Sequence, residues 1–187
     1  SAVIYQNNLV FYDVSTDGYN GLNIFNPSNK SQERIGGELN TEGYTYQIIG
    51  VQDGICAVFA SRRKGSTSPS RIIGVEINSG ERLWDKQLAK NAFTDYRFTA
   101  GDGGSAMTPN EVVIASVNRN DSGIIKPVVQ SYSLEDGSLR WNTELPPSLG
   151  KDINNLRIYE PSILITSESV YISQLNYNSG FITKTFV

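Results

Sequence analysis

Acidic side chains are the first candidates for chemistry in this chain of 187 residues, because carboxylate oxygens can hold Ca²⁺. Four of them stand in or near expected connections between strands: Asp95, Asp102, Asp121 and Asp136. Their spacing does not match the ligand pattern of an EF-hand loop. We therefore expect solvated turn residues at these positions and predict no metal site.

A glycine-rich segment, Gly101-Asp102-Gly103-Gly104-Ser105, superficially suggests a cradle for phosphate. A P-loop requires a lysine and a following helix, and the sequence provides neither after this segment. We interpret it as a connecting loop.

Nucleophilic catalysis lacks a base in this sequence, which contains no histidine and one cysteine. Cys56 lies in the apolar run 54–59, where a thiol behaves as a small hydrophobic side chain. A catalytic cysteine or a serine of the Ser-His-Asp type requires a histidine. A lysine-based serine mechanism stays open. We predict no catalytic residue and no bound cofactor.

The charge balance limits the classes of partner. A net charge of −3 argues against a nucleic-acid surface, which needs clustered lysine and arginine. No apolar stretch is long enough to span a bilayer, so we predict no membrane insertion by this segment. A single cysteine allows no disulfide within the chain, which is compatible with either the cytosol or the periplasm.

An internal repeat gives the strongest indication of architecture. Residues 73–84 and 130–141 share a pattern that ends in glycine, three residues and tryptophan, at an offset of 57 residues. In this register Gly80 corresponds to Gly137 and Trp84 to Trp141. We predict that the glycines are turn residues and that the tryptophans pack neighbouring repeats together.

Short strands are expected along the whole chain, since the apolar residues alternate with a period of two between turn residues. Repetition at this spacing favours a β-propeller over a sandwich, with all-β blades of four antiparallel strands. The blades are expected at residues 1–39, 41–88, 89–145 and 156–187. We expect three complete blades and a partial fourth that stops in its third strand. Open edges of such a segment are expected to pair with a protein partner or a second copy.

The repeated pattern resembles that of the quinoprotein-like (PQQ-like) β-propeller family. Residues 105–116 also resemble the outer strand, turn and following strand of that family. The resemblance implies that the glycine closes the hairpin between the third and fourth strands. It also implies that the tryptophan docks between blades, near the glycine of an adjacent turn. The first unit has a comparable turn without glycine or tryptophan, and Lys184 stands four residues after Gly180 in the last unit.

The resemblance leaves three functions open. The chain looks like the non-enzymatic branch of the family, which implies a non-catalytic binding or scaffold module within a larger assembly. The first alternative is a fragment of a PQQ-dependent dehydrogenase whose active site lies outside this segment. The second is a carbohydrate-binding surface module. The resemblance slightly favours a periplasmic or extracellular location, although the residues themselves leave the compartment open.

Aromatic residues in or near the expected connections are the candidate partner contacts, because tyrosine is enriched at interfaces. The candidates are Tyr19, Tyr44, Tyr96 and Tyr159. Packing within the fold is the alternative role at each of these positions.

Overall fold

The computed structural model describes the strands and most of the tight turns of the chain. The described residues are 2–14, 19–37, 39, 44–62, 70–88, 92–93, 105–119, 125–145, 153–159, 162–167, 172–176 and 178–186. No helix occurs among them, so the described part contains no helix that could cross a membrane.

Four antiparallel sheets follow one another along the chain, each with its strands in sequence order. The first sheet consists of β1 (Ala2–Tyr5), β2 (Asn8–Val14), β3 (Asn20–Asn26) and β4 (Ser31–Ile35). The second consists of β5 (Tyr44–Gln52), β6 (Ile55–Arg62), β7 (Arg71–Glu76) and β8 (Arg82–Gln87). The third consists of β10 (Ser105–Met107), β11 (Glu111–Arg119), β12 (Ile125–Ser133) and β13 (Leu139–Glu144), with β9 (Ala92–Phe93) paired to β11. The fourth consists of β14 (Ile153–Tyr159), β15 (Ser162–Ser167), β16 (Ile172–Asn176) and β17 (Ile182–Phe186).

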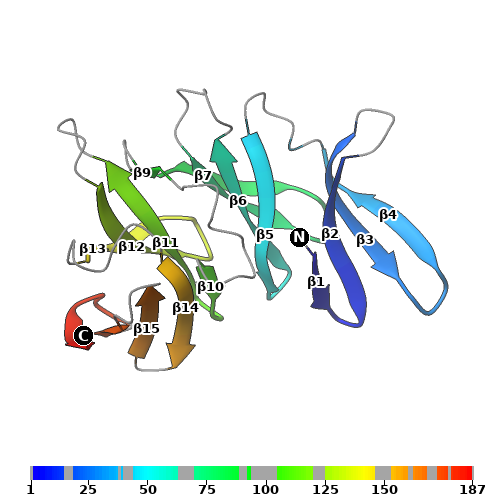
Figure 1. Ribbon diagram of the computed structural model, residues 1–187. Coiled ribbons are helices and arrows are strands. Elements are labelled where there is room, and N and C mark those ends of the chain that lie inside the picture. The colour runs from blue at the N-terminus through cyan, green and yellow to red at the C-terminus, as the bar shows by residue number, and fades with distance from the viewer. Residues whose placement is uncertain are drawn as a thin grey trace.

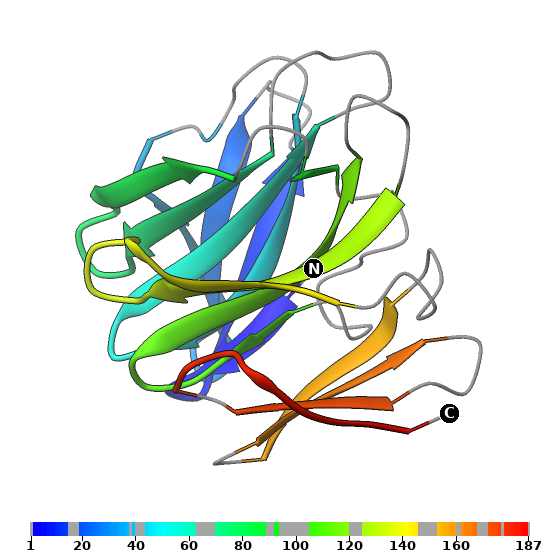
Figure 2. The same ribbon diagram turned by 90° about the vertical axis from the view of Figure 1, so that its left-hand side faces the viewer.

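The sheets are arranged as an open arc of propeller blades. In Figure 1 they run from the first sheet in blue at the right to the fourth in orange and red at the lower left. Figure 2 shows the fourth sheet lying below the third. The first strand of each sheet contacts the first strand of the next, from β1 to β5, β10 and β14. This is the arrangement of a partial β-propeller and confirms the all-β fold expected from the sequence.

The fourth sheet contains four strands, so the expectation that this unit stops in its third strand is wrong. The strand that the sequence analysis missed is β14, which begins before the expected boundary at residue 156. Asn154 and Asn155 interrupt the apolar alternation there, and the pairing with β15 shifts register between Ile153 and Asn155. Two adjacent polar residues at a register shift break the apolar alternation of period two, so the sequence pattern does not reveal this strand.

Glycines at positive φ close the outer hairpins of three sheets. Gly80, Gly137 and Gly180 have φ values of +71°, +68° and +68°. The N–H of each glycine donates to the carbonyl oxygen four residues earlier, at 2.8–3.0 Å. Lys30 occupies this place in the first sheet with φ of +59°, a conformation that costs more for a residue with a Cβ.

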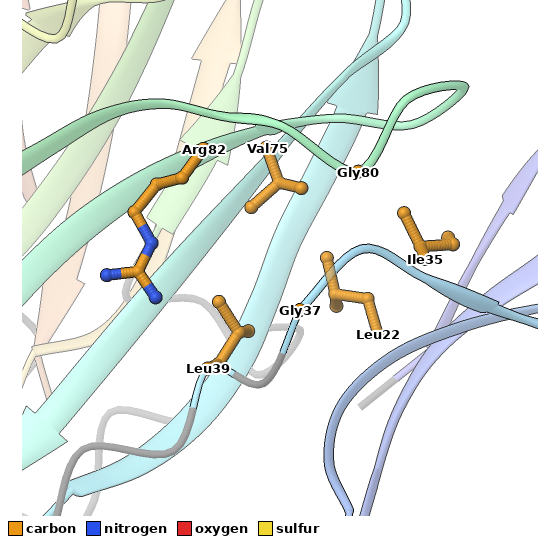
Figure 3. A pocket seen from close by; sticks show the side chains of 7 residues that line it. All are labelled: Leu22, Ile35, Gly37, Leu39, Val75, Gly80 and Arg82. Atoms are coloured by element: carbon orange, nitrogen blue, oxygen red, sulfur yellow. The ribbon is translucent and has the colours of Figure 1, made fainter.

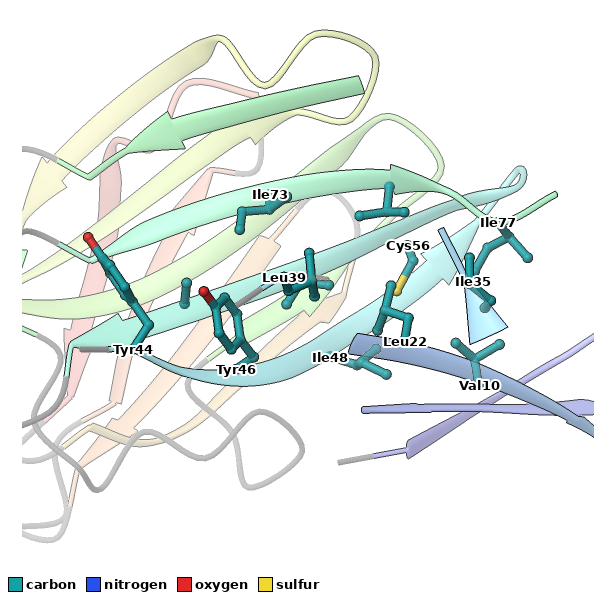
Figure 4. Packing of buried hydrophobic residues seen from close by; sticks show 13 residues of the cluster. Val10, Leu22, Ile35, Leu39, Tyr44, Tyr46, Ile48, Cys56, Ile73 and Ile77 are labelled. Atoms are coloured by element: carbon teal, nitrogen blue, oxygen red, sulfur yellow. The ribbon is translucent and has the colours of Figure 1, made fainter. Parts of the chain in front are cut away.

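The second sheet is covered on both faces because its side chains alternate. From β6, Cys56, Val58 and Ala60 point toward the first sheet, where they join a buried cluster with residues of β2, β3 and β4. Figure 4 shows this packing, with the thiol of Cys56 inside it. Ala57 and Phe59 point the opposite way, into a cluster shared with the third sheet. Residues 55–60 of β6 are all apolar, and this continuous run is thus the reason that this blade can be sandwiched between two others.

Candidate functional site at the blade junctions

Trp84 joins the second and third blades. Its indole Nε1 donates a hydrogen bond of 2.9 Å to the carbonyl oxygen of Leu134, and its side chain is buried. The ring also lies against Gly137, where a Cβ would come within 2.8 Å of ring atoms. On its own sheet the ring covers Gly74, which leaves no room for a side chain there. The two glycines therefore form the two walls that hold the indole.

Trp141 lies at the equivalent junction between the third and fourth blades. Its ring occupies the space that a Cβ on Gly180 would need, and it is also buried. Thr143 adds a hydrogen bond of 2.6 Å from its Oγ1 to the carbonyl oxygen of Gly180. Gly180 was not among the docking residues expected from the sequence. The signal that could have found it is the 43-residue step from Gly137 to the next serine-glycine turn.

The first junction is built differently. Gly36, at φ of +67°, brings its backbone against the backbone of Gly80, and a Cβ on either glycine would collide with the other. Ile24 pairs with Glu33 in the first sheet, at the register where Gly74 pairs with Trp84 in the second. Backbone contact between two glycines thus replaces the tryptophan at this junction.

A partly open cavity of about 230 Å³ lies beside the Gly36–Gly80 contact. Figure 3 shows that it is lined from the first sheet side by Leu22, Ile35, Gly37 and Leu39, and from the second sheet by Val75, Gly80 and Arg82. Leu22, Ile35, Leu39 and Val75 are buried, so the wall is largely apolar.

The charged side of this cavity is formed by Arg82, whose side chain runs toward Leu39 in Figure 3. Its Nη1 lies 3.1 Å from Asp85 Oδ2, and Arg71 Nε lies 2.7 Å from Asp85 Oδ1. The hydrogen bond to Asp85 raises the pKa of Arg71. One carboxylate therefore faces two guanidinium groups, and the three side chains together carry a net positive charge.

A second charged group is buried in the third sheet. Glu111 is 3% exposed and accepts hydrogen bonds from Ser131 Oγ at 2.7 Å and from Arg140 Nη1 at 2.8 Å. Its backbone N–H donates to Thr108 Oγ1 at 3.1 Å. The carboxylate is fully partnered within its own blade, which is the arrangement expected of a structural group.

Of the four aspartates considered as metal ligands, the structure describes one, and three lie outside the described residues. Asp136 accepts hydrogen bonds from Ser138 N at 3.0 Å and from Ser138 Oγ at 2.7 Å, which lower its pKa to about 2. It therefore acts as a turn residue. Asp95, Asp102 and Asp121 lie in the segments left undescribed. Within the part of the chain that the structure describes, no group of three side chains is placed to hold a metal ion.

The structure describes the side chains of two of the four candidate partner contacts. Tyr19 is 7% exposed; its hydroxyl donates to the carbonyl oxygen of Leu22 at 2.8 Å, and the guanidinium of Arg34 lies 4.4 Å from its ring centroid. Tyr44 is also buried, in the core between the first two sheets. These two tyrosines pack within the chain and present little surface to a partner. Tyr96 and the side chain of Tyr159 lie outside the description.

Four stacked sheets of this kind, joined in succession with buried rings at two junctions, define the chain as part of a β-propeller. No family model matches the sequence, and no curated protein sequence matches it at a significant level. Solved structures do match over 99% of the chain. They include BamB from Moraxella catarrhalis (13% identity, TM-score 0.54), a europium-containing methanol dehydrogenase (11%, 0.55) and apo AztD from Citrobacter koseri (12%, 0.64).

The chain spans less than half the length of these structures, namely 47%, 40% and 45% of them in the same order. At such low sequence identity the similarity shows the fold alone. The shared fold is a β-propeller built of four-stranded antiparallel sheets.

Proposed function

We propose that this segment is a non-catalytic propeller scaffold that binds a protein partner, in the manner of the non-enzymatic branch of the PQQ-like family. The observation that carries the proposal is an uncovered apolar row on the first sheet. Ile4 pairs with Leu9, and Leu9 pairs with Phe25, so these three side chains lie side by side on one face. Ile4 is 81% exposed and Leu9 is 38% exposed.

This row lies on the face turned away from the second sheet. Val3, Val10 and Ile24, which precede or follow these residues by one position, point into the core between the two sheets. Side chains of a strand alternate between its faces, so Ile4, Leu9 and Phe25 must point outward. The second sheet, by comparison, has both faces covered. Exposed apolar rows of this kind are typical of interaction surfaces.

The contact surface is therefore assigned to the outer face of the first sheet. A protein partner or a second copy would cover the apolar side chains of this face, as the neighbouring blades cover both faces of the second sheet. BamB and AztD are among the solved structures that this segment resembles in fold.

A dehydrogenase fragment is the second candidate, and the similarity to a methanol dehydrogenase favours it. Its active site would lie outside this segment. Incubation of the full-length protein with PQQ and Ca²⁺ distinguishes the two proposed functions. Quinone absorbance that stays with the protein supports the dehydrogenase and contradicts the scaffold.

Site-specific photo-crosslinking tests the proposed surface. A photoreactive phenylalanine analogue replaces Ile4 in one variant and Leu139, which is 52% exposed on the third sheet, in the matched control. The scaffold proposal expects a protein adduct from position 4 in the native source and little from position 139. Equal adducts from both positions, or none from position 4, would contradict it.

A further inference from the structure

The cavity at the first junction lies beside the Gly36–Gly80 contact, which takes the place of the Trp84–Gly137 contact at the next junction. At the offset of 57 residues, its wall residues Val75, Gly80 and Arg82 correspond to Tyr132, Gly137 and Leu139 of the third sheet. At that next junction the ring of Trp84 packs on Gly137 and clusters with Tyr132. At the first junction Gly36 packs on Gly80 in place of an indole, and Val75 stands where the next junction has the larger Tyr132; the cavity lies next to these residues.

The size of this space suits an aromatic ring. A cavity of about 150 Å³ lined by Leu, Ile and Phe side chains is large enough to bind benzene. The first-junction cavity is about 230 Å³, with Leu22, Ile35, Leu39 and Val75 in its wall. An apolar ring larger than benzene can therefore enter without displacing the core.

The charge of Arg82 determines which aromatic compounds the cavity favours. Arg82 lines the cavity and its side chain is 39% exposed, so its guanidinium can reach both the ligand and water. Asp85 also pairs with Arg71, so Arg71, Arg82 and Asp85 together carry one excess positive charge. A guanidinium on the wall of a largely apolar cavity favours a carboxylate attached to the ring.

We propose that the first junction is a binding site for a small planar aromatic carboxylate of about the size of an indole acid. The ring takes the apolar space between Leu22 and Val75, and the carboxylate accepts hydrogen bonds from Arg82. This site is on the opposite face of the first sheet from the proposed partner surface, and it does not depend on that proposal.

Titration with indole-3-carboxylate and its uncharged amide, indole-3-carboxamide, tests the site, using chemical-shift changes of backbone amides in the intact chain. Both compounds contain the same ring, so their difference measures the carboxylate. We expect saturable changes centred on Leu22, Leu39 and Val75, with the acid binding about tenfold more tightly than the amide. Arg82→Gln should remove this tenfold preference, whereas Lys86→Gln, at an exposed residue on the same strand, should retain it.

A cavity-filling variant provides the second arm. Val75→Phe places a ring where the third sheet has Tyr132, and we expect it to abolish binding of both compounds while the fold is retained. Leu139→Phe adds the same ring at an exposed site and should bind as the unchanged chain does. The proposal is overturned if neither compound shifts these amides, or if Val75→Phe binds normally. If Val75→Phe does not fold, the unchanged chain provides the test: amide shifts that lie away from Leu22, Leu39 and Val75 overturn the proposal.

Discussion

The indole Nε1 of Trp84 donates to the carbonyl oxygen of Leu134 at 2.9 Å, across the boundary between two blades and 50 residues along the chain. The same ring presses on Gly137 at the end of the next hairpin. One side chain thus fixes both the spacing and the orientation of the two sheets. The junction predicts which substitutions the propeller tolerates.

Trp84→Ala should lower the free energy of unfolding by about 3–5 kcal/mol, because it removes a buried aromatic ring and leaves a cavity. Leu83→Ala, at the adjacent and 41% exposed residue, should change it by about 0.5 kcal/mol or less. Urea unfolding followed by tryptophan fluorescence measures both, with the signal coming from Trp141 in the first variant and from both indoles in the second. Equal effects of the two substitutions would contradict the docking role.

Gly137→Ala should destabilise the chain by more than the roughly 1–2 kcal/mol that a left-handed conformation costs a residue with a Cβ. The added Cβ would also meet the ring of Trp84 within 2.8 Å. Gly37→Ala is the matched control, because a Cβ at Gly37 meets nothing within 4 Å. Thermal unfolding of the two variants should separate them clearly, and a similar midpoint for both would refute the expected contact.

Acid should destabilise the chain partly through the turn at Asp136. Hydrogen bonds from Ser138 lower the pKa of this carboxyl from 3.8 to about 2 in the folded chain. Because the folded value is the lower one, the stabilisation is present above the unfolded pKa and is lost as the pH falls from about 4 toward 2. Asp136→Asn should therefore flatten the unfolding free energy across that pH range. An unchanged slope would rule out this contribution.

Cys56 should resist thiol reagents in the folded chain. Burial raises the pKa of its thiol to about 12, and the side chain is fully buried. Almost no thiolate is then present at pH 8. Reaction with an aromatic disulfide reagent is expected only after addition of urea, at the rate of a free cysteine. Rapid reaction without denaturant would mean that the core between the first two blades opens readily.

The sequence predicts some of these features because they leave large signals. Trp84 and Trp141 stand out since an indole and a turn glycine recur at a fixed offset. The contact of Gly36 with Gly80 leaves no such signal, because it lies outside the repeated register. Tyr19 looked like a loop residue available to a partner, and only the folded chain shows that Arg34 covers its ring.

The outer face of the first sheet is visible in the sequence only as an ordinary alternating strand. Which of its two faces is covered depends on the position of the next blade, and this is a property of the assembled fold. The cavity beside Gly80 likewise results from the meeting of two sheets. Pattern analysis along one strand cannot locate either of them.

The native mass of the chain, measured by light scattering on material recovered from its source, tests the scaffold account most directly. The account predicts a mass above 20.6 kDa for the unchanged chain and a return to 20.6 kDa for the double variant Ile4→Asp, Leu9→Asp. A mass of 20.6 kDa for the unchanged chain, or a larger mass that the double variant retains, would contradict it.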